Sequence, residues 1–582
     1  MSCLSFFFAD FITGMGVFYH AILELATADM PGKTLLKKSL ALLTLQQTNI
    51  LSAAFIIMGT VIFSQLLGLV RQRLLVGIFG ASNTLGVYLA AGRLPDFVFQ
   101  IIIAGALSSA FIPVFSDYLV KNKEEEGYTF ASTLLALGLL LFFVVSLILF
   151  LFAPFFARLV APGFSPTEIH LMGQLMQVML IGELLFIIGS FLSAVLQSYN
   201  HFFIPGIAAA LYNLGIILGL VLLSPFVGIF APAYGVIIGA LFFVVLQIPL
   251  TRHVGFRFHV SGLLHNKGIA EVFHLMWPRT ISLAIFQVGT LITVTLVSFL
   301  PDAGRNYVIL DYAQTLAFAP VGLFGQTIAQ AAFPVLSRQK DTISAFKITF
   351  LTSFFQMLYL ILPVSVLLIV LRIPVVRLIY GASLFDWPAT VLTGRTLALF
   401  AISLFAQALI YLVSRGFYAL HDTKIPLIVG AVTTAIMLGL GAVSVLIWHL
   451  GVGSIAIAYS IGSVLQFVIL FIWLDRKIHG FDKHELIRTT AKLTFASICT
   501  AFALYIPIKL LDQLVFDTTK TINFLIITGI SSIIGLGIYV LITWFLDVKE
   551  AKTYVLMLKK LGNWQEILHA SGENIENATL KP

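Results

Sequence analysis

The chain has 582 residues, of which 59% are hydrophobic and only 10% are Asp, Glu, Lys or Arg, and its mean hydropathy is +1.02. Soluble proteins carry about 25% charged residues, so this composition excludes a soluble globular protein and indicates a membrane protein. The net charge of +8 would suit a nucleic-acid partner, but the basic residues lie in short segments between apolar runs, which argues against one. Cys3 and Cys499 are too few for a disulfide framework or a cysteine metal site.

The chain begins with a segment, residues 1–48, that we expect to be cytoplasmic or interfacial. Its apolar stretch contains Asp10 and His20 and lacks the n-region of a signal peptide. Apolar runs of about 20 residues, the length that a spanning helix needs, then recur from residue 50 to 546. We expect about 14 spanning helices, at approximately 51–79, 87–116, 128–153, 170–198, 203–224, 229–250, 273–299, 307–335, 346–370, 391–419, 425–449, 453–474, 490–510 and 522–546.

The distribution of Lys and Arg predicts how these helices are oriented. If the N-terminus lies in the cytoplasm, the inner segments and the polar tail at 547–582 collect most of the basic residues. The outer loops then hold little beyond Arg305 and Lys520. Cytoplasmic loops carry this excess under the positive-inside rule, so we expect a multi-pass protein of the bacterial inner membrane with both termini inside.

An internal repeat is visible at an offset of 221 residues. Ala110–Ser116 resembles Ala331–Ser337, and the same offset relates Pro205 to Pro426. The sequence therefore predicts an all-α fold with two six-helix copies inserted in parallel, followed by two C-terminal helices.

This repeat suggests a division into domains. We expect an N-terminal lobe at 49–252, a cytoplasmic linker at 253–272, a C-terminal lobe at 273–475 and two further spanning helices at 476–546. Parallel repeats place the path of a substrate between the two lobes.

Ionisable side chains inside the predicted spans are candidates for function, because a charge there is costly unless it faces a cavity or a partner. Arginines outnumber carboxylates among them, and guanidinium groups bind phosphate oxygens in a bidentate manner, which favours an anionic substrate. The candidate substrate-binding residues are Arg71, Arg73, Arg93, Asp96, Arg279 and Arg395. For Arg73, Arg279 and Arg395, near span ends, snorkelling to the headgroups is the alternative.

Two further charges flank a tight inner turn. Arg415 and Asp422 lie on either side of the turn that leads into Pro426, and we expect them to hold it as a structural or gating element. Glu183 and Asp311 also lie within predicted spans and receive no specific role.

Motifs for catalysis, nucleotides or metals are not evident. Pro31–Thr34 resembles the end of a phosphate-binding loop, but Thr27 stands where its first glycine should be. The histidines of the central linker fit no usual zinc spacing. We therefore expect a transporter rather than an enzyme, with no cofactor and no metal, and leave a coupling cation open.

Several segments together resemble a known family. Ser64–Arg71, Arg93–Asp96, Gly105–Pro113 and Arg415–Pro426 resemble the signatures of the MurJ (MviN) family of lipid II flippases, within the MOP exporter superfamily. The resemblance covers residues 37 to 546. It implies a 14-helix, two-lobed MOP- and MATE-like fold with an alternately opening cavity. It also implies a polyprenyl-pyrophosphate lipid as substrate, with membrane lipids and cell-wall synthesis proteins as partners.

The chain departs from that family at several charged positions. Where members carry arginines, this sequence has Gln65, Phe99, Gln100 and Thr315, and Ala104 stands in place of a Glu. The function that we favour is flipping of the undecaprenyl-pyrophosphate-linked peptidoglycan precursor, lipid II. The alternatives are a flippase or exporter of another polyprenyl-linked oligosaccharide, a cation-coupled drug exporter and a non-transporting membrane scaffold.

Overall fold

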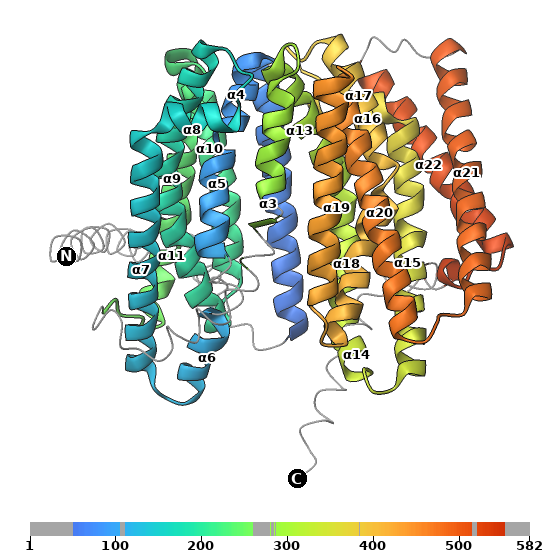
Figure 1. The fold of residues 1–582 in the computed structure, drawn as a ribbon, viewed down its shortest axis with the longest axis horizontal. Coiled ribbons are helices and arrows are strands. Elements are labelled where there is room, and N and C mark those ends of the chain that lie inside the picture. Colours follow the sequence, from blue (N-terminus) through green and yellow to red (C-terminus); the bar gives the residue numbers. More distant parts are fainter. Residues whose placement is uncertain are drawn as a thin grey trace, which may run out of the picture. The chain divides into compact units, whose positions relative to one another are not determined.

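The computed structural model describes residues 50–104, 111–259, 280, 284–285, 287–382, 384–514, 521–552 and 554. Every regular element in these ranges is a helix, which confirms the predicted all-α membrane fold (Figure 1). Among the described residues, twelve helices are long and apolar enough to cross a membrane, or thirteen if a bent pair is counted as one span. The predicted count of 14 is approximate. The predicted segment 1–48 and most of the predicted linker and tail lie outside the described residues.

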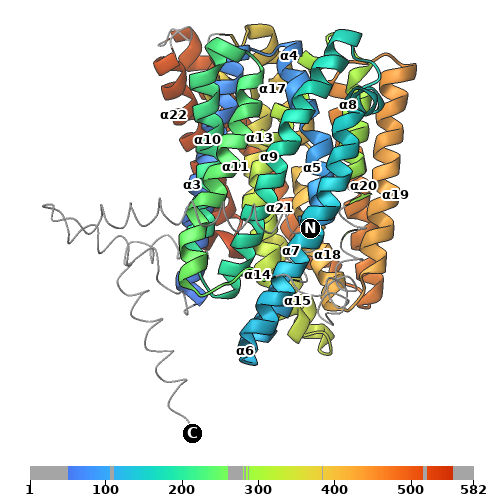
Figure 2. The ribbon, with the colours of Figure 1, turned by 90° about the vertical axis from the view of Figure 1, so that its left-hand side faces the viewer.

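The first copy of the repeat covers residues 50–253. Its long helices expose apolar side chains such as Leu140, Phe143 and Leu147, as expected for helices that face lipid. Figure 2 shows α9, α10 and α11 as neighbours, and α3 also packs on α10. The elements are α3 (Ile50–Phe79), α4 (Asn83–Ala91), α5 (Arg93–Phe99), the π-helix η1 (Gln100–Ala104), α6 (Ile112–Val120), α7 (Glu124–Leu151), α8 (Ala153–Val160), α9 (Pro166–Ser198), α10 (Phe203–Val227) and α11 (Phe230–His253).

The second copy covers residues 287–477 and is followed by two further helices. It begins with the short apolar helix Gln287–Ser298, which lies within the predicted seventh span. The remaining elements are α13 (Ala303–Pro320), η3 (Val321–Gln326), α14 (Thr327–Arg338), α15 (Ile343–Val370), α16 (Arg372–Tyr380), α17 (Trp387–Ala401), α18 (Leu404–Ala419), α19 (Lys424–Ala442), η4 (Val443–Ile447), α20 (Gly453–Lys477), α21 (Lys483–Leu514) and α22 (Thr521–Phe545).

The backbone confirms the predicted repeat. Left-handed backbone conformations, which few residue types adopt readily, recur at the predicted offset: Asn200 and His421 have φ of 60° and 56°, and Gly228 and His449 have φ of 55° and 50°. The π-helix η3 also begins 221 residues after η1. The two copies therefore share turns and a helical irregularity, in addition to apolar runs.

The chain divides into two compact units. The first contains the described residues up to Val308 together with 382 and 384–385, and the second contains the remaining described residues from Ile309 onward. Within the second unit, α22 packs along α21 and reaches α15, where the Tyr539 hydroxyl donates to the Tyr359 carbonyl at 3.0 Å. The predicted lobe boundaries at 252, 273 and 475 stay predictions.

Candidate functional site

The second predicted span is a succession of helical pieces. Ser82 caps the start of α4 by accepting a hydrogen bond from Leu85 N at 3.2 Å, and α4 ends at Gly92. Pro95 in the first turn of α5 has no N–H to donate, and the π-helix η1 follows. π-helical turns are rare and frequently lie at functional sites. The sequence motif that contains Arg93 and Asp96 therefore stands at an irregular point of the bundle.

Arg93 is held by a tyrosine. Its Nε donates to the Tyr307 hydroxyl at 2.7 Å, and its guanidinium carbon lies 5.9 Å from the centre of the Tyr307 ring. Tyr307 is 3% exposed and belongs to the first unit. This contact orients the guanidinium through Nε, so its planar group is held in a defined position.

Five ionisable or phenolic side chains from five helices form a polar cluster inside the first copy. Arg71 of α3, which is half-buried, interacts electrostatically with Tyr88 of α4 and Tyr212 of α10. Asp96 of α5 interacts electrostatically with the same two tyrosines and with the carboxyl group of Glu183 of α9. We call these five residues the N-terminal polar cluster.

The two carboxyl groups of the cluster differ in their exposure to solvent. Glu183 is 8% exposed, and its Oε2 is buried without a hydrogen-bond partner among the residues that the structure describes. Asp96, in contrast, is exposed. With one arginine and two carboxyl groups, the cluster is mixed in charge, whereas the sequence had favoured an arginine-rich cavity.

The other predicted substrate-binding residues lie elsewhere. Arg73 is exposed on α3, and Arg395 is exposed on α17 in the second unit. Arg279 lies outside the described residues. The binding roles of these three, and of Arg71, Arg93 and Asp96, stay predictions.

Phe99, where the family resemblance implies an arginine, is part of an aromatic group. It is 9% exposed, and its ring centre lies 5.3 Å from that of Phe186. Phe186 in turn lies 4.9 Å from both Tyr212 and Phe243. Apolar packing thus replaces a charge at this position, and the aromatic group borders the polar cluster through Tyr212, which belongs to both.

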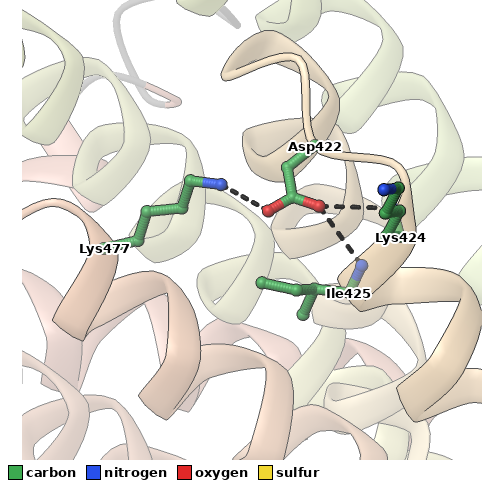
Figure 3. A network of polar contacts seen from close by, with 4 residues as sticks. All are labelled: Asp422, Lys424, Ile425 and Lys477. Atoms are coloured by element: carbon green, nitrogen blue, oxygen red, sulfur yellow. Dashed lines mark hydrogen bonds and ion pairs between the residues drawn. The ribbon is translucent and has the colours of Figure 1, made fainter.

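The turn between α18 and α19 is stabilised by Asp422 (Figure 3). Its Oδ1 accepts from the backbone N–H groups of Lys424 and Ile425, each at 3.2 Å, and its Oδ2 forms an ion pair with Lys477 at the end of α20. Burial raises the pKa of Asp422. The hydrogen bonds from Lys477 and from the backbone of Ile425 and Lys424, together with the charge of Lys477, outweigh burial and hold that pKa below its usual value. Pro426 is buried in the first turn of α19.

Arg415 makes a different contact. Its guanidinium carbon lies 5.2 Å from the centre of the Phe333 ring in α14. The hydrogen bonds and the ion pair that stabilise the turn are therefore made by Asp422 and not by Arg415. A gating role for Arg415, Asp422 or Pro426 stays a prediction.

At one end of the first unit, the backbone of α4 lies in close contact with the backbone around Gly304. A Cβ atom added at Gly86 would lie 1.9 Å from the Gly304 carbonyl oxygen, so only glycine fits there. The Arg305 N–H donates to Asn83 Oδ1 at 2.9 Å, and the Gly163 N–H donates to the Ser298 hydroxyl at 3.0 Å. The beginning of the second copy is thereby joined to α4 and to the loop after α8.

Sequence reasoning missed the phenolic members of this site. Tyr88, Tyr212 and Tyr307 do not stand out in apolar spans. Glu183 was visible as a charge within a span, but nothing in the sequence placed it beside Asp96. Within the described ranges, no three His, Cys, Asp or Glu side chains are grouped closely enough to hold a metal ion.

The fold is that of a multi-pass membrane protein built from two parallel six-helix repeats, an architecture typical of alternating-access transporters. Residues 75–528 match the family model described as "Lipid II flippase MurJ". The chain therefore belongs to the MurJ family of lipid II flippases.

Individual proteins agree with this assignment. The chain is similar to "Probable lipid II flippase MurJ" of Buchnera aphidicola, with 28% identity over 450 residues that cover 75% of this chain and 86% of that protein. Among solved structures, "Lipid II flippase MurJ, inward closed conformation" matches with a TM-score of 0.71 and 23% identity, covering 84% of this chain and 98% of the other. An inward-facing MATE family transporter of the MOP superfamily matches with a TM-score of 0.60 and 14% identity, covering 73% and 98%, which shows a shared fold.

Proposed function

We propose that this chain flips lipid II, the undecaprenyl-pyrophosphate-linked peptidoglycan precursor, across the bacterial cytoplasmic membrane by alternating access. Family membership supports this activity. The observation that carries the mechanism is the presence of Arg71 and Arg93 on membrane-spanning helices of the first copy. Arg93 is hydrogen-bonded to Tyr307, and Arg71 interacts electrostatically with Tyr88 and Tyr212. Arginine in a spanning helix is costly and typically marks the path of a substrate.

In this mechanism the two arginines bind the pyrophosphate during its passage. A guanidinium group carries five N–H donors in a plane and matches the oxygens of a phosphate in a bidentate manner. The Tyr307 hydroxyl accepts from Arg93 Nε at 2.7 Å, which fixes the plane of the group. Its other nitrogens would then meet the anion in a defined orientation. Arg71 would supply the second positive charge, and the aromatic group around Phe186 would form a wall that does not compete for the phosphate.

We also propose that both termini lie in the cytoplasm. The turns at one end of the second unit gather basic side chains: Lys340 Nζ lies 3.2 Å from His421 Nε2, Lys347 Nζ donates to the His479 carbonyl at 3.2 Å, and Lys477 pairs with Asp422. Cytoplasmic loops carry such an excess of Lys and Arg. Impermeant thiol reagents added outside intact cells would then label a cysteine introduced at Arg305 but not one introduced at Lys424; the reverse pattern would refute this orientation.

The partners proposed on the same basis are the lipid substrate, the surrounding membrane lipids and the cell-wall synthesis proteins that supply and use that lipid. The only observation that would favour a different polyprenyl-linked oligosaccharide as the substrate is the absence of arginines at positions where the family carries them. At Phe99 aromatic packing against Phe186 occupies the position of the lost charge. No observation favours a second function.

Complementation tests the proposal in cells. The chain should restore growth to bacteria depleted of their own lipid II flippase, whereas Arg71→Ala and Arg93→Ala should fail at equal protein levels. Arg158→Ala, which removes an exposed arginine of α8, is the matched control and should complement. If the inserted wild-type chain does not restore growth, the proposed substrate is wrong. If it does and both arginine variants also do, the binding mechanism is wrong.

A further inference from the structure

The second copy carries an exposed polar face that the proposed binding of pyrophosphate does not use. Gln326 at the end of η3 and Gln330 in the first turn of α14 are both exposed. Tyr411 of α18 is 40% exposed, and Gln326 Nε2 donates to its hydroxyl at 2.9 Å. No ionisable residue occurs between Val321 and Ser337. We call Gln326, Gln330 and Tyr411 the amide face.

The ends of α14 and α18 fix the depth of this face. Lys340 Nζ lies 3.2 Å from His421 Nε2, so the turns that follow the two helices lie at the same level. Tyr411 lies eight residues before the end of α18, and Gln326 lies twelve residues before the end of α14. At 1.5 Å per residue they are about 12 and 18 Å from those ends, deeper than a headgroup layer of about 5–8 Å. The amide face therefore lies at the depth of the hydrocarbon core.

At this depth a side chain that faces lipid is expected to be apolar. The exposed residues of α7, such as Phe143 and Leu147, meet that expectation. A glutamine in hydrocarbon loses its hydrogen bonds with water, which is costly unless protein groups replace them. Gln326 has one replacement, the Tyr411 hydroxyl, and Gln330 has none among the residues that the structure describes. Exposed amides of this kind are expected where a helix faces water inside the membrane.

The backbone of η3 brings the partners of this face together. A Cβ atom added at Gly325 would lie 2.9 Å from Ala408 Cα, so the glycine lets η3 approach α18 closely enough for Gln326 to bond to Tyr411. A Cβ atom at Gly322, one turn before Gln326, would meet nothing within 4 Å, so space remains beside η3. π-helical turns such as η3 frequently lie at functional sites.

The chemistry of the amide face suits an uncharged ligand rich in hydrogen-bonding groups. A glutamine amide offers two N–H donors and a carbonyl acceptor, and a phenol both donates and accepts through one oxygen. Phosphates prefer cationic donors, and the amide face has none. Sugars with hydroxyl and N-acetyl groups match such amides, and their C–H faces stack on exposed aromatic rings such as that of Tyr411.

We propose that the amide face binds the sugar part of the lipid II head group through hydrogen bonds to Gln326 and Gln330 and through contact with Tyr411. This inference rests on the proposed function, because it takes lipid II as the substrate. It assigns to the second copy a part of that substrate that carries no phosphate.

Binding by the whole protein in detergent tests the assignment. One probe is a short-chain prenyl pyrophosphate that carries the disaccharide of lipid II without its peptide, and the other is the same pyrophosphate without sugars. Wild type should bind the sugar-bearing probe more tightly. Gln326→Leu and Tyr411→Phe should each weaken its binding by about fivefold, the effect of one lost hydrogen bond, and leave the sugar-free probe unaffected. Tyr234→Phe, which alters a tyrosine of α11 that is 39% exposed, is the matched control and should change neither affinity.

Thiol labelling tests the aqueous face without any substrate. In a Cys3→Ala, Cys499→Ala background, Gln330→Cys should react with a water-soluble thiol reagent in broken membranes. Leu147→Cys, also exposed but on α7, should not react, because the reactive thiolate requires water. Equal reaction at the two positions, or none at Gln330→Cys, overturns the amide face as a binding site whether or not either probe binds.

The binding results distinguish failure of this proposal from failure of the proposed function. If wild type binds neither probe, the proposed function is wrong and the sugar assignment falls with it. If wild type binds both probes equally tightly, or if Gln326→Leu weakens both to the same extent, the sugar assignment is wrong and the pyrophosphate function stands. Retained binding of the sugar-free probe also shows that each variant is folded.

Discussion

The long helix α9 of the first copy runs without a break through Gly182 and Glu183, whereas its counterpart in the second copy is divided into α17 and α18, which are bent by 42° at Ile402 and Ser403. At the repeat offset, Ser403 corresponds to Gly182 and Leu404 to Glu183. The two copies thus place different chemistry at the same point of a common framework. The first copy has an unbroken helix with a buried carboxyl group, and the second has a bend with a buried hydroxyl group.

The polar groups of the two copies differ in how well they are satisfied. In the second copy, Gln407 Nε2 donates to the Ser403 hydroxyl at 2.8 Å, and the hydroxyls of Ser403 and Ser460 lie 3.0 Å apart. In the first copy, Glu183 Oε2 remains without a partner among the described residues. Neutral groups that satisfy one another stabilise a bend, while an ionisable group left unsatisfied is a candidate for function. The second span of the first copy likewise carries an ionisable group where the second copy has none, since Asp96 corresponds to Ala317 at the repeat offset.

The largest effect is expected at the backbone contact between Gly86 and Gly304. Gly86→Ala should abolish growth in the complementation assay, because its Cβ would lie 1.9 Å from the Gly304 carbonyl oxygen and the two segments could not meet. Gly439→Ala is the control, since nothing lies within 4 Å of a Cβ at that helical position of the second copy. Growth of the Gly86→Ala strain at the wild-type rate would show that this contact is not part of the transport cycle.

The next largest effect is a difference in flipping rate between variants that lack an arginine of the first copy and a variant that lacks an arginine of the second copy. Arg71→Ala or Arg93→Ala should slow flipping by roughly ten- to a hundredfold, because a hydrogen bond to a charged group contributes about 1.5–3 kcal/mol. Arg395→Ala, which removes an exposed arginine of the second copy, should slow it by less than threefold. Rates of lipid II export in cells measure the difference, and a larger loss from Arg395→Ala would reverse the assignment.

A smaller effect should distinguish the two buried polar sites by stability. Ser403→Ala leaves Gln407 and Ser460 each short of one hydrogen bond and should lower the free energy of unfolding by about 1–2 kcal/mol. Glu183→Gln should leave it unchanged within about 1 kcal/mol, because it removes an unsatisfied ionisable group and keeps the volume. Reversible unfolding in mixed micelles provides both values. Equal destabilisation by the two substitutions would contradict a structural role in one copy and a functional role in the other.

The smallest effect concerns the turn between α18 and α19. Because the pKa of Asp422 lies below its usual value of 3.8, its pair with Lys477 stabilises the folded protein above that pH and is lost as pH falls through the lowered pKa. A double-mutant cycle with Asp422→Asn and Lys477→Met should give a coupling of about 0.2–1 kcal/mol at neutral pH, as for other partly exposed ion pairs, and none below the lowered pKa. A coupling that persists in acid would refute the ionic origin of this contact.

The sequence predicts the framework better than the site. Apolar runs define the spans because backbone groups in lipid must be satisfied within helices, and the offset of 221 residues follows from matching prolines and turns. The break at Gly92 and the bend at Ser403 were not predicted, since both lie inside apolar runs that read as continuous. Arg71, Arg93 and Asp96 were found because charges are conspicuous in spans. Tyr88 and Tyr212 were missed, because a tyrosine in an apolar span is usually part of the hydrophobic core. Only the packing of α4 and α10 brings these two side chains to the polar cluster.

Flipping by the purified protein tests the central claim most directly. Lipid II with a fluorescent head group is placed in proteoliposomes, and a membrane-impermeant quencher reports how much of it reaches the outer leaflet with time. We predict that wild-type protein makes lipid II accessible well beyond the half already exposed, and that the double variant Arg71→Ala, Arg93→Ala behaves like protein-free vesicles. Equal flipping by the double variant and wild type, with both inserted to the same extent, would contradict the proposal that these membrane arginines carry the pyrophosphate.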